Sequence, residues 1–208
     1  MKKSKRTKKS NFWKFKQNKD QYFKKSKILG FRSRASFKLI EINEKFQFLK
    51  KNIYLLDLGS SPGGWSQVAS KKIIKGKILS IDKKLMDPIK NVNFLKYDLL
   101  NPKTKDKILH YFGGKIDVIL SDMAADTTGN KSLDSIRTNG LCMETLNLSK
   151  KILKPTGVLV SKLFMGDDFL EVKKLAKSLF ENVNFFKPKS SKNESKETYL
   201  HCKILKTL

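Results

Sequence analysis

Short apolar segments alternate with segments of helical periodicity along most of this chain. Strands are predicted for the seven apolar segments, which are 52–59, 76–82, 92–98, 115–122, 158–164, 182–188 and 197–205. Helices are predicted for the periodic segments, which are 33–49, 65–72, 103–111, 135–153 and 168–180. Parallel strands need crossover connections of this length, so the alternation predicts an α/β fold. We expect a parallel or mostly parallel seven-stranded sheet with helices on both faces.

Local signals refine the ends of these elements and the domain boundaries. Ser33 or Ser36 is available to cap the first helix, and the "KPTG" segment at 154–157 is a stop signal after the long one. The 208 residues are enough for one domain with a sizeable core. We expect a basic, partly mobile extension over 1–30 and the domain over 31–208. The "KSSKNESK" segment at 189–196 is predicted to be a mobile loop.

Charge indicates the class of partner. The net charge is +26, from 45 basic and 19 acidic residues, and the first 27 residues hold twelve of the basic ones and one acid. A surface of this charge attracts polyanions. Five aromatic residues lie among these charges and could stack on unpaired bases: Phe12, Trp13, Phe15, Tyr22 and Phe23. A codon bias toward lysine is the alternative explanation, but the concentrated arm favours a nucleic acid, either RNA or DNA.

A glycine-rich turn follows the first predicted strand, in "LLDLGSSPGGW". Ser61 occupies the second glycine position of the dinucleotide fingerprint, and the turn lacks the lysine of a P-loop. Gly59 and Gly63 still allow a ligand to approach the backbone. Asp57 is the acid at the end of this strand.

Asp82 and Asp98 end the next two predicted strands. Acids at strand ends can simply cap the following helices. Three acids on successive strands beside a glycine turn instead favour a ligand with a ribose and no phosphate. S-adenosylmethionine, which carries a ribose, an adenine and a sulfonium cation, fits this description. The sequence therefore predicts S-adenosylmethionine as the cofactor.

Lys162 follows the buried-looking residues Val158 to Val160. A lysine here either points to water as the strand finishes, or lies where open α/β sheets bind ligands, at the carboxyl ends of the strands. Taken alone, the segment favours the first interpretation.

Several classes of protein are disfavoured. No apolar run is long enough to span a bilayer, and no apolar signal segment follows the basic amino terminus, so we expect neither a membrane partner nor export. Cys142 and Cys202 form no C-x-x-C pair, and the two histidines are His110 and His201. This composition offers no metal site or disulfide framework and is typical of a reducing cytoplasm.

The motifs "GFRSRASFKL", "DLGSSPGGW", "LMDPI", "SDMA", "VSKLF" and "SKETY" occur in the order and spacing of one known family. Over about Tyr22 to Ile204 the chain resembles the FtsJ/RlmE family of ribosomal RNA 2′-O-ribose methyltransferases. The resemblance implies a Rossmann-like S-adenosylmethionine-dependent methyltransferase fold. It also implies transfer of a methyl group to the 2′-hydroxyl of a uridine in the 23S RNA of the assembled large ribosomal subunit. We expect the enzyme to be a cytoplasmic monomer.

The family's catalytic tetrad falls on four residues of this chain: Lys38, Asp122, Lys162 and Glu197. Its cofactor contacts fall on Gly63, Trp65, Asp82, Asp98 and Asp122. Lys162 can act as a base only if it is neutral, which requires burial and Lys38 to outweigh the two carboxylates. Otherwise Lys162 orients the hydroxyl, and the sequence leaves both roles open. Arg32 and Arg34 are expected to bind phosphate oxygens.

Three alternatives share some of these motifs. A 2′-O-methyltransferase acting on transfer RNA would have all of them. A non-catalytic ribosome-assembly factor could keep the fold, although an intact tetrad and an open glycine turn argue against it. A nicotinamide oxidoreductase is disfavoured by Ser61 and by the tetrad.

Overall fold

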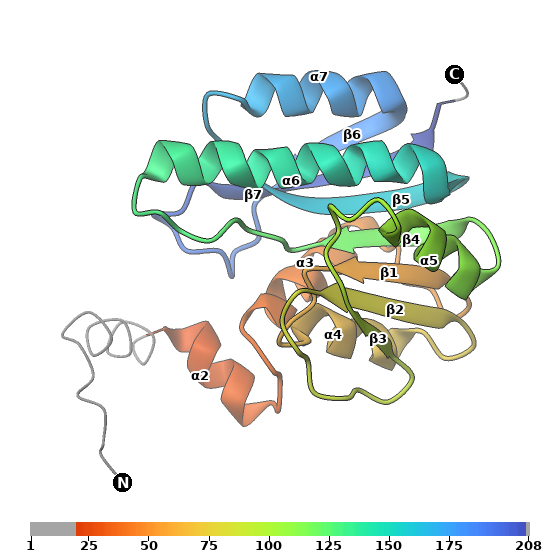
Figure 1. Ribbon diagram of the computed structural model, residues 1–208. Coiled ribbons are helices and arrows are strands. Elements are labelled where there is room, and N and C mark those ends of the chain that lie inside the picture. The colour runs from red at the N-terminus through yellow and green to blue at the C-terminus, as the bar shows by residue number, and fades with distance from the viewer. Residues whose placement is uncertain (1–19, 207–208) are drawn as a thin grey trace, which may run out of the picture.

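The computed structural model describes residues 20–206, which form one seven-stranded sheet with helices on both faces (Figure 1). The strand order is β3-β2-β1-β4-β5-β7-β6. The strands are β1 (Tyr54–Leu58), β2 (Lys77–Asp82), β3 (Asn93–Lys96), β4 (Ile116–Ser121), β5 (Leu153–Phe164), β6 (Phe180–Phe186) and β7 (Glu197–Leu205). The predicted α/β architecture with a mostly parallel sheet is confirmed.

The sheet divides the core into two layers, and helices cover each of them. In Figure 1 the strands run from β6 near the top to β3 near the bottom, with α6 and α7 in the upper half of the picture and α3 and α4 in the lower half. The helices are α2 (Gln21–Ile28), α3 (Ala35–Phe46), α4 (Gly64–Lys72), α5 (Thr104–Phe112), α6 (Lys131–Ile152) and α7 (Phe169–Leu179). One buried cluster joins the sheet to α5, α6 and α7, and the other joins it to α3 and α4. No helix within residues 20–206 is long and apolar enough to cross a membrane.

Strand β7 is the exception to the parallel arrangement. It runs antiparallel between β5 and β6, with Lys162 opposite Tyr199 and Phe164 opposite Glu197. The five strands from β1 to β5 are parallel to their neighbours. The first residue of β7 therefore lies at the same edge of the sheet as the last residues of β4 and β5. This edge is where open α/β sheets bind ligands.

Three local predictions are wrong in detail. Neither predicted serine caps α3, because the side chain of Ser36 instead donates a hydrogen bond to the Gly64 carbonyl, at 3.0 Å. Helix α6 begins at Lys131, earlier than expected, because the Asn130 side chain accepts hydrogen bonds from the first-turn amides. The "KPTG" segment at 154–157 belongs to β5, where exposed residues bulge out between two stretches of pairing with β4.

The predicted basic extension over 1–30 is described from residue 20 onward, and that part contains α2. Asp20 caps this helix by accepting hydrogen bonds from two backbone amides at 3.0 and 3.1 Å. The Tyr22 ring packs against Phe37, with 5.5 Å between centroids. The aromatic residues Phe12, Trp13 and Phe15 lie outside the described residues.

Candidate active site

A cavity of about 480 Å³ lies at the carboxyl ends of the central parallel strands. Residues at or just after the ends of four strands line it, among them Gly59, Asp82, Asp98 and Asp122, and Arg137 of α6 also contributes. Four of the sequence-predicted site residues are therefore brought to one place. The cavity has a volume within the range of small-molecule and cofactor sites.

Asp82 is held so that its carboxylate keeps capacity to bind a ligand. One oxygen accepts a hydrogen bond from the Ser61 amide at 2.9 Å, and the other accepts one from the Lys84 amide at 2.7 Å. A carboxylate has about four acceptor sites, so two remain after these backbone contacts. An acceptor with two free lone pairs fits the adjacent hydroxyls of a ribose.

Asp98 lies nearby with a different environment. Its side chain is 41% accessible, and its Oδ2 lies 3.0 Å from the Lys83 ammonium. Its slight burial opposes ionisation, but a hydrogen bond from the Leu100 amide and the Lys83 charge hold the pKa of Asp98 below its ordinary value. Asp98 is therefore a carboxylate at neutral pH and offers a second acceptor at the rim.

Gly59 keeps the turn after β1 close to the loop after β4. Its φ of 71° lies in the left-handed region, and a Cβ added there would lie 2.5 Å from the Met123 side chain. A side chain at this position would push Met123 away. Because Gly59 has no Cβ, Met123 can pack against the turn and form part of the cavity wall.

Three predicted cofactor residues do not line the cavity. Asp57 is fully buried beneath it, where its Oδ2 accepts a hydrogen bond from the Ser66 hydroxyl. Trp65 is buried in the core, and its Nε1 donates to the Ala35 carbonyl at 2.8 Å. Gly63 has a φ of 106° and caps the start of α4. Their predicted cofactor contacts stay predictions.

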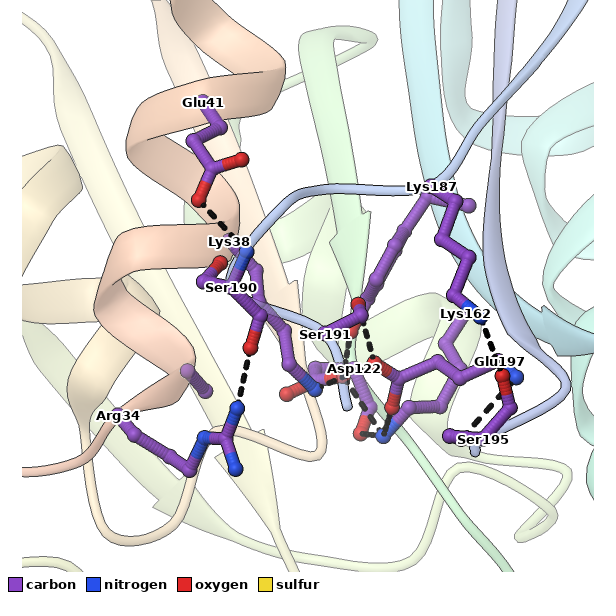
Figure 2. Close-up of polar contacts among 12 residues, drawn as sticks. Arg34, Lys38, Glu41, Asp122, Lys162, Lys187, Ser190, Ser191, Ser195 and Glu197 are labelled. Carbon is purple, nitrogen blue, oxygen red and sulfur yellow. Dashed lines mark hydrogen bonds and ion pairs between the residues drawn. The ribbon is translucent and has the colours of Figure 1, made fainter. Parts of the chain in front are cut away.

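The four predicted catalytic residues form a continuous chain of ion pairs (Figure 2). Lys38 from α3 lies 2.6 Å from Glu197 Oε1, and Lys162 lies 3.3 Å from Glu197 Oε2. Lys162 also lies 2.8 Å from Asp122 Oδ1. Asp122 lines the cavity, so the chain reaches the cavity through this residue.

Charge balance sets the protonation states of this cluster. Burial disfavours the Lys162 ammonium, but Asp122 and Glu197 outweigh it and raise the pKa of Lys162 above its ordinary value. Burial likewise disfavours both carboxylates, but the two lysines hold the pKa values of Asp122 and Glu197 below their ordinary range. Lys162 is therefore a cation and its two partners are anions at neutral pH.

Tyr199 also belongs to this site, although the sequence analysis gave no role to this last residue of the "SKETY" motif. Its side chain is fully buried, and its hydroxyl donates a hydrogen bond to Asp122 Oδ1 at 2.8 Å. Burial and the adjacent carboxylates raise its pKa well above the ordinary value, so it remains a donor. The register of β5 and β7 sets Tyr199 opposite Lys162, and this pairing brings its hydroxyl to the site.

The two arginines near Lys38 make hydrogen bonds within the protein, and their expected binding to phosphate oxygens stays a prediction. Arg32 donates to the carbonyls of Asp87 and Pro88 at 2.5 and 2.6 Å. Arg34 pairs with Asp20 and donates to the Ser190 carbonyl. These guanidinium groups hold loops together in the structure.

Fold and site together define a class, the Rossmann-like S-adenosylmethionine-dependent methyltransferases. Membership of this class confirms S-adenosylmethionine as the predicted cofactor. Human methyltransferase-like protein 13, solved in complex with SAH, shares the fold with a TM-score of 0.56 at 17% identity. The model of the FtsJ-like methyltransferase family matches residues 31–205. The chain belongs to the FtsJ-like methyltransferase family, as its motifs indicated.

Individual relatives agree with this assignment. A protein named Ribosomal RNA large subunit methyltransferase E from Pelagibacter ubique (strain HTCC1062) is 46% identical over 197 residues, covering 95% of this chain and 97% of the relative. Its namesake from Rickettsia akari (strain Hartford) is 45% identical, with 94% and 89% covered. A crystal structure from Plasmodium falciparum, provisionally described as a ribosomal RNA methyltransferase, has a TM-score of 0.75 at 36% identity, with 84% and 98% covered.

Proposed function

We propose that this protein transfers a methyl group from S-adenosylmethionine to the 2′-hydroxyl of a uridine ribose in 23S ribosomal RNA, acting on the assembled large subunit in the cytoplasm. One observation carries the proposal: Asp122 belongs both to the cofactor-sized cavity and to the Lys38–Glu197–Lys162 chain of ion pairs. The relatives named as large-subunit methyltransferases support the ribosomal substrate.

The cavity residues fit the cofactor. S-adenosylmethionine, when bound, supplies an electrophilic methyl group on a sulfonium sulfur. Asp82 offers two acceptor positions to the ribose hydroxyls, and Asp98 offers an acceptor at the rim. Asp122, an anion beside Lys162, lines the cavity, so the transferable methyl group would meet the substrate next to it.

Lys162 acts on the substrate hydroxyl as an ammonium. Because its pKa is raised, it donates a hydrogen bond to the 2′-oxygen and stabilises the negative charge that develops as the hydroxyl proton leaves. Asp122 and Glu197 hold the ammonium in place, and Lys38 holds Glu197. The hydroxyl proton passes to solvent. Positioning of this kind contributes a large share of the rate in such reactions.

The substrate is an RNA because the reaction needs a 2′-hydroxyl, which DNA lacks. The net charge of +26 supports binding to a polyanion as large as a ribosomal subunit. Binding should weaken steeply with added salt, since each lysine–phosphate contact releases a counterion.

The proposal is tested by transfer of a labelled methyl group to three substrates: large subunits lacking their modifications, the free 23S RNA, and bulk transfer RNA. Wild type and Lys162→Ala are compared, and cofactor affinity is measured for both by calorimetry. Alkaline hydrolysis of the product separates ribose from base methylation, because a 2′-O-methyl group blocks cleavage of the adjacent phosphodiester.

We expect label in the large subunit, resistant to alkali and lowered at least about 100-fold by Lys162→Ala, with cofactor affinity unchanged. Label only in transfer RNA would overturn the ribosomal substrate and leave the reaction standing. Base methylation would overturn the 2′-hydroxyl as the acceptor. Cofactor binding without label in any RNA would favour an assembly factor that keeps the fold.

A further inference from the structure

The loop between β6 and β7, residues 187–196, is lysine-rich and was predicted to be mobile, yet its two central serines are buried. Ser190 and Ser191 are 0% and 4% exposed. Figure 2 shows this loop passing between helix α3 and Glu197. Such burial in a charged segment needs specific partners for the backbone polar groups.

Glu41, on α3, supplies those partners. Its Oε2 accepts a hydrogen bond from the Lys189 amide at 2.6 Å, and its Oε1 accepts one from the Ser190 amide at 3.0 Å. The Ser190 carbonyl in turn accepts a hydrogen bond from Arg34. One carboxylate and one guanidinium thus hold consecutive backbone groups of the loop, and charge-assisted bonds of this kind are the stronger ones.

Ser191, the next residue along the loop, contacts the catalytic glutamate. Its hydroxyl donates a hydrogen bond to Glu197 Oε1 at 2.9 Å, the same oxygen that pairs with Lys38 at 2.6 Å. The other carboxylate oxygen faces Lys162. The place of Ser191 therefore determines how Glu197 divides its two oxygens between the two lysines.

Spacing on α3 explains how one element does both tasks. Arg34, which precedes the first residue of α3, lies four residues before Lys38, and Glu41 lies three residues after it, so the three share one face of the helix. Arg34 and Glu41 on that face bind the loop, and Lys38 between them binds Glu197. The helix therefore fixes the position of the loop relative to Lys38.

We propose that Glu41 is a positioning residue of the methyl-transfer site, which holds Ser190 and Ser191 so that Glu197 bridges Lys38 and Lys162. Glu41 touches neither the cofactor cavity nor the reacting atoms, and it acts through Ser191. This proposal rests on the proposed function, because its effect is on the rate of that reaction.

The test compares Glu41→Gln with Glu44→Gln, a matched control that removes the same charge from an exposed position on the same helix. Ser191→Ala and the Glu41→Gln/Ser191→Ala double variant complete a cycle. For each protein we would measure kcat and KM for methyl transfer to large subunits, the cofactor dissociation constant and the unfolding temperature. Hydrogen exchange of the Lys189 and Ser190 amides reports on the contact itself.

We expect Glu41→Gln to lower kcat about 10-fold, with KM and cofactor affinity within about two-fold of wild type, because a small misplacement of catalytic groups is costly. Glu44→Gln should retain the wild-type kcat. The double variant should be no slower than the slower single variant, since Glu41 acts on Glu197 only through Ser191. Exchange at the two amides should accelerate in the two variants that carry Glu41→Gln, and stay at the wild-type rate in Glu44→Gln and Ser191→Ala.

Several results would overturn the positioning role. An equal kcat for Glu41→Gln and Glu44→Gln would overturn it. A double variant whose fold-loss in kcat is the product of the two single losses would overturn it as well. A joint loss of cofactor affinity and unfolding temperature in Glu41→Gln would make Glu41 a purely structural residue. A wild type that methylates no RNA, with exchange still accelerated in Glu41→Gln, would refute the proposed function and leave the contact as a structural one.

Discussion

Asp57 should make the stability of this protein fall as the pH rises. The residue is fully buried in β1, its Oδ2 is bonded to Ser66, and its Oδ1 has no partner among the described residues. Burial, supported by the nearby charges of Asp122 and Asp82, raises the pKa of Asp57 from 3.8 to about 7, although the Ser66 hydrogen bond opposes this. Between these two values the folded state keeps a proton that the unfolded state has released.

The size of the effect follows from linkage. One pKa unit corresponds to about 1.4 kcal/mol, so the rise corresponds to a loss of about 4 kcal/mol once the pH exceeds 7. About 2.5 kcal/mol of this loss develops between pH 5 and pH 8. Asp57→Asn keeps the shape and an acceptor for Ser66 but cannot ionise, so the variant should lack this slope.

Urea unfolding of wild type and Asp57→Asn at pH 5, 6, 7 and 8 measures the effect. The result is the difference in unfolding free energy between the two proteins, because groups that titrate in the same way in both contribute nothing to that difference. His201 is one such group: burial lowers its pKa to about 4, which raises stability between pH 4 and 6.5 in both proteins. The reasoning fails if the difference in unfolding free energy stays constant within about 0.5 kcal/mol from pH 5 to pH 8.

Three further outcomes are expected. Asp82→Ala should weaken cofactor binding about 10- to 100-fold by calorimetry, because hydrogen bonds to a charged group contribute about 1.5–3 kcal/mol. Asp98→Ala should weaken it less, because the Asp98 carboxylate already pairs with Lys83; equal losses would refute the ranking. Asn139→Ala should lower the unfolding free energy by about 2 kcal/mol, because its buried amide bonds both backbone groups of Phe164; an unchanged urea midpoint would count against this. Between pH 7 and 9, kcat should vary less than about two-fold if Lys162 acts as an ammonium, whereas a ten-fold rise per pH unit would require a neutral lysine base.

The order of strands and helices could be predicted because periodicity along the chain reports it directly. The acids at 82, 98 and 122 could be placed at one edge because the carboxyl ends of parallel strands meet there. The position of β7 could not be read in the same way. Periodicity identifies a strand but does not name its neighbours, so its antiparallel insertion between β5 and β6 had no local signal.

Residues whose role depends on that insertion were therefore missed by pattern reasoning. Glu197 was assigned through a family resemblance, and Tyr199 was not assigned at all, although both lie on β7. The 189–196 segment was misjudged because its composition is that of a solvated loop. Its burial comes from Glu41, which is about 150 residues away in the chain and lies beside the loop only in the folded protein.

The insertion of β7 also sets an order on how the site can be assembled. During synthesis β7 leaves the ribosome after both of the strands that it separates. Until it arrives, β5 lacks one of its two neighbours and β6 lacks the strand that joins it to the sheet. Glu197 arrives with that same strand. A nascent polypeptide can therefore form most of the cofactor cavity early. It cannot complete the Lys38–Glu197–Lys162 ion pairs until β7 has been inserted into the sheet.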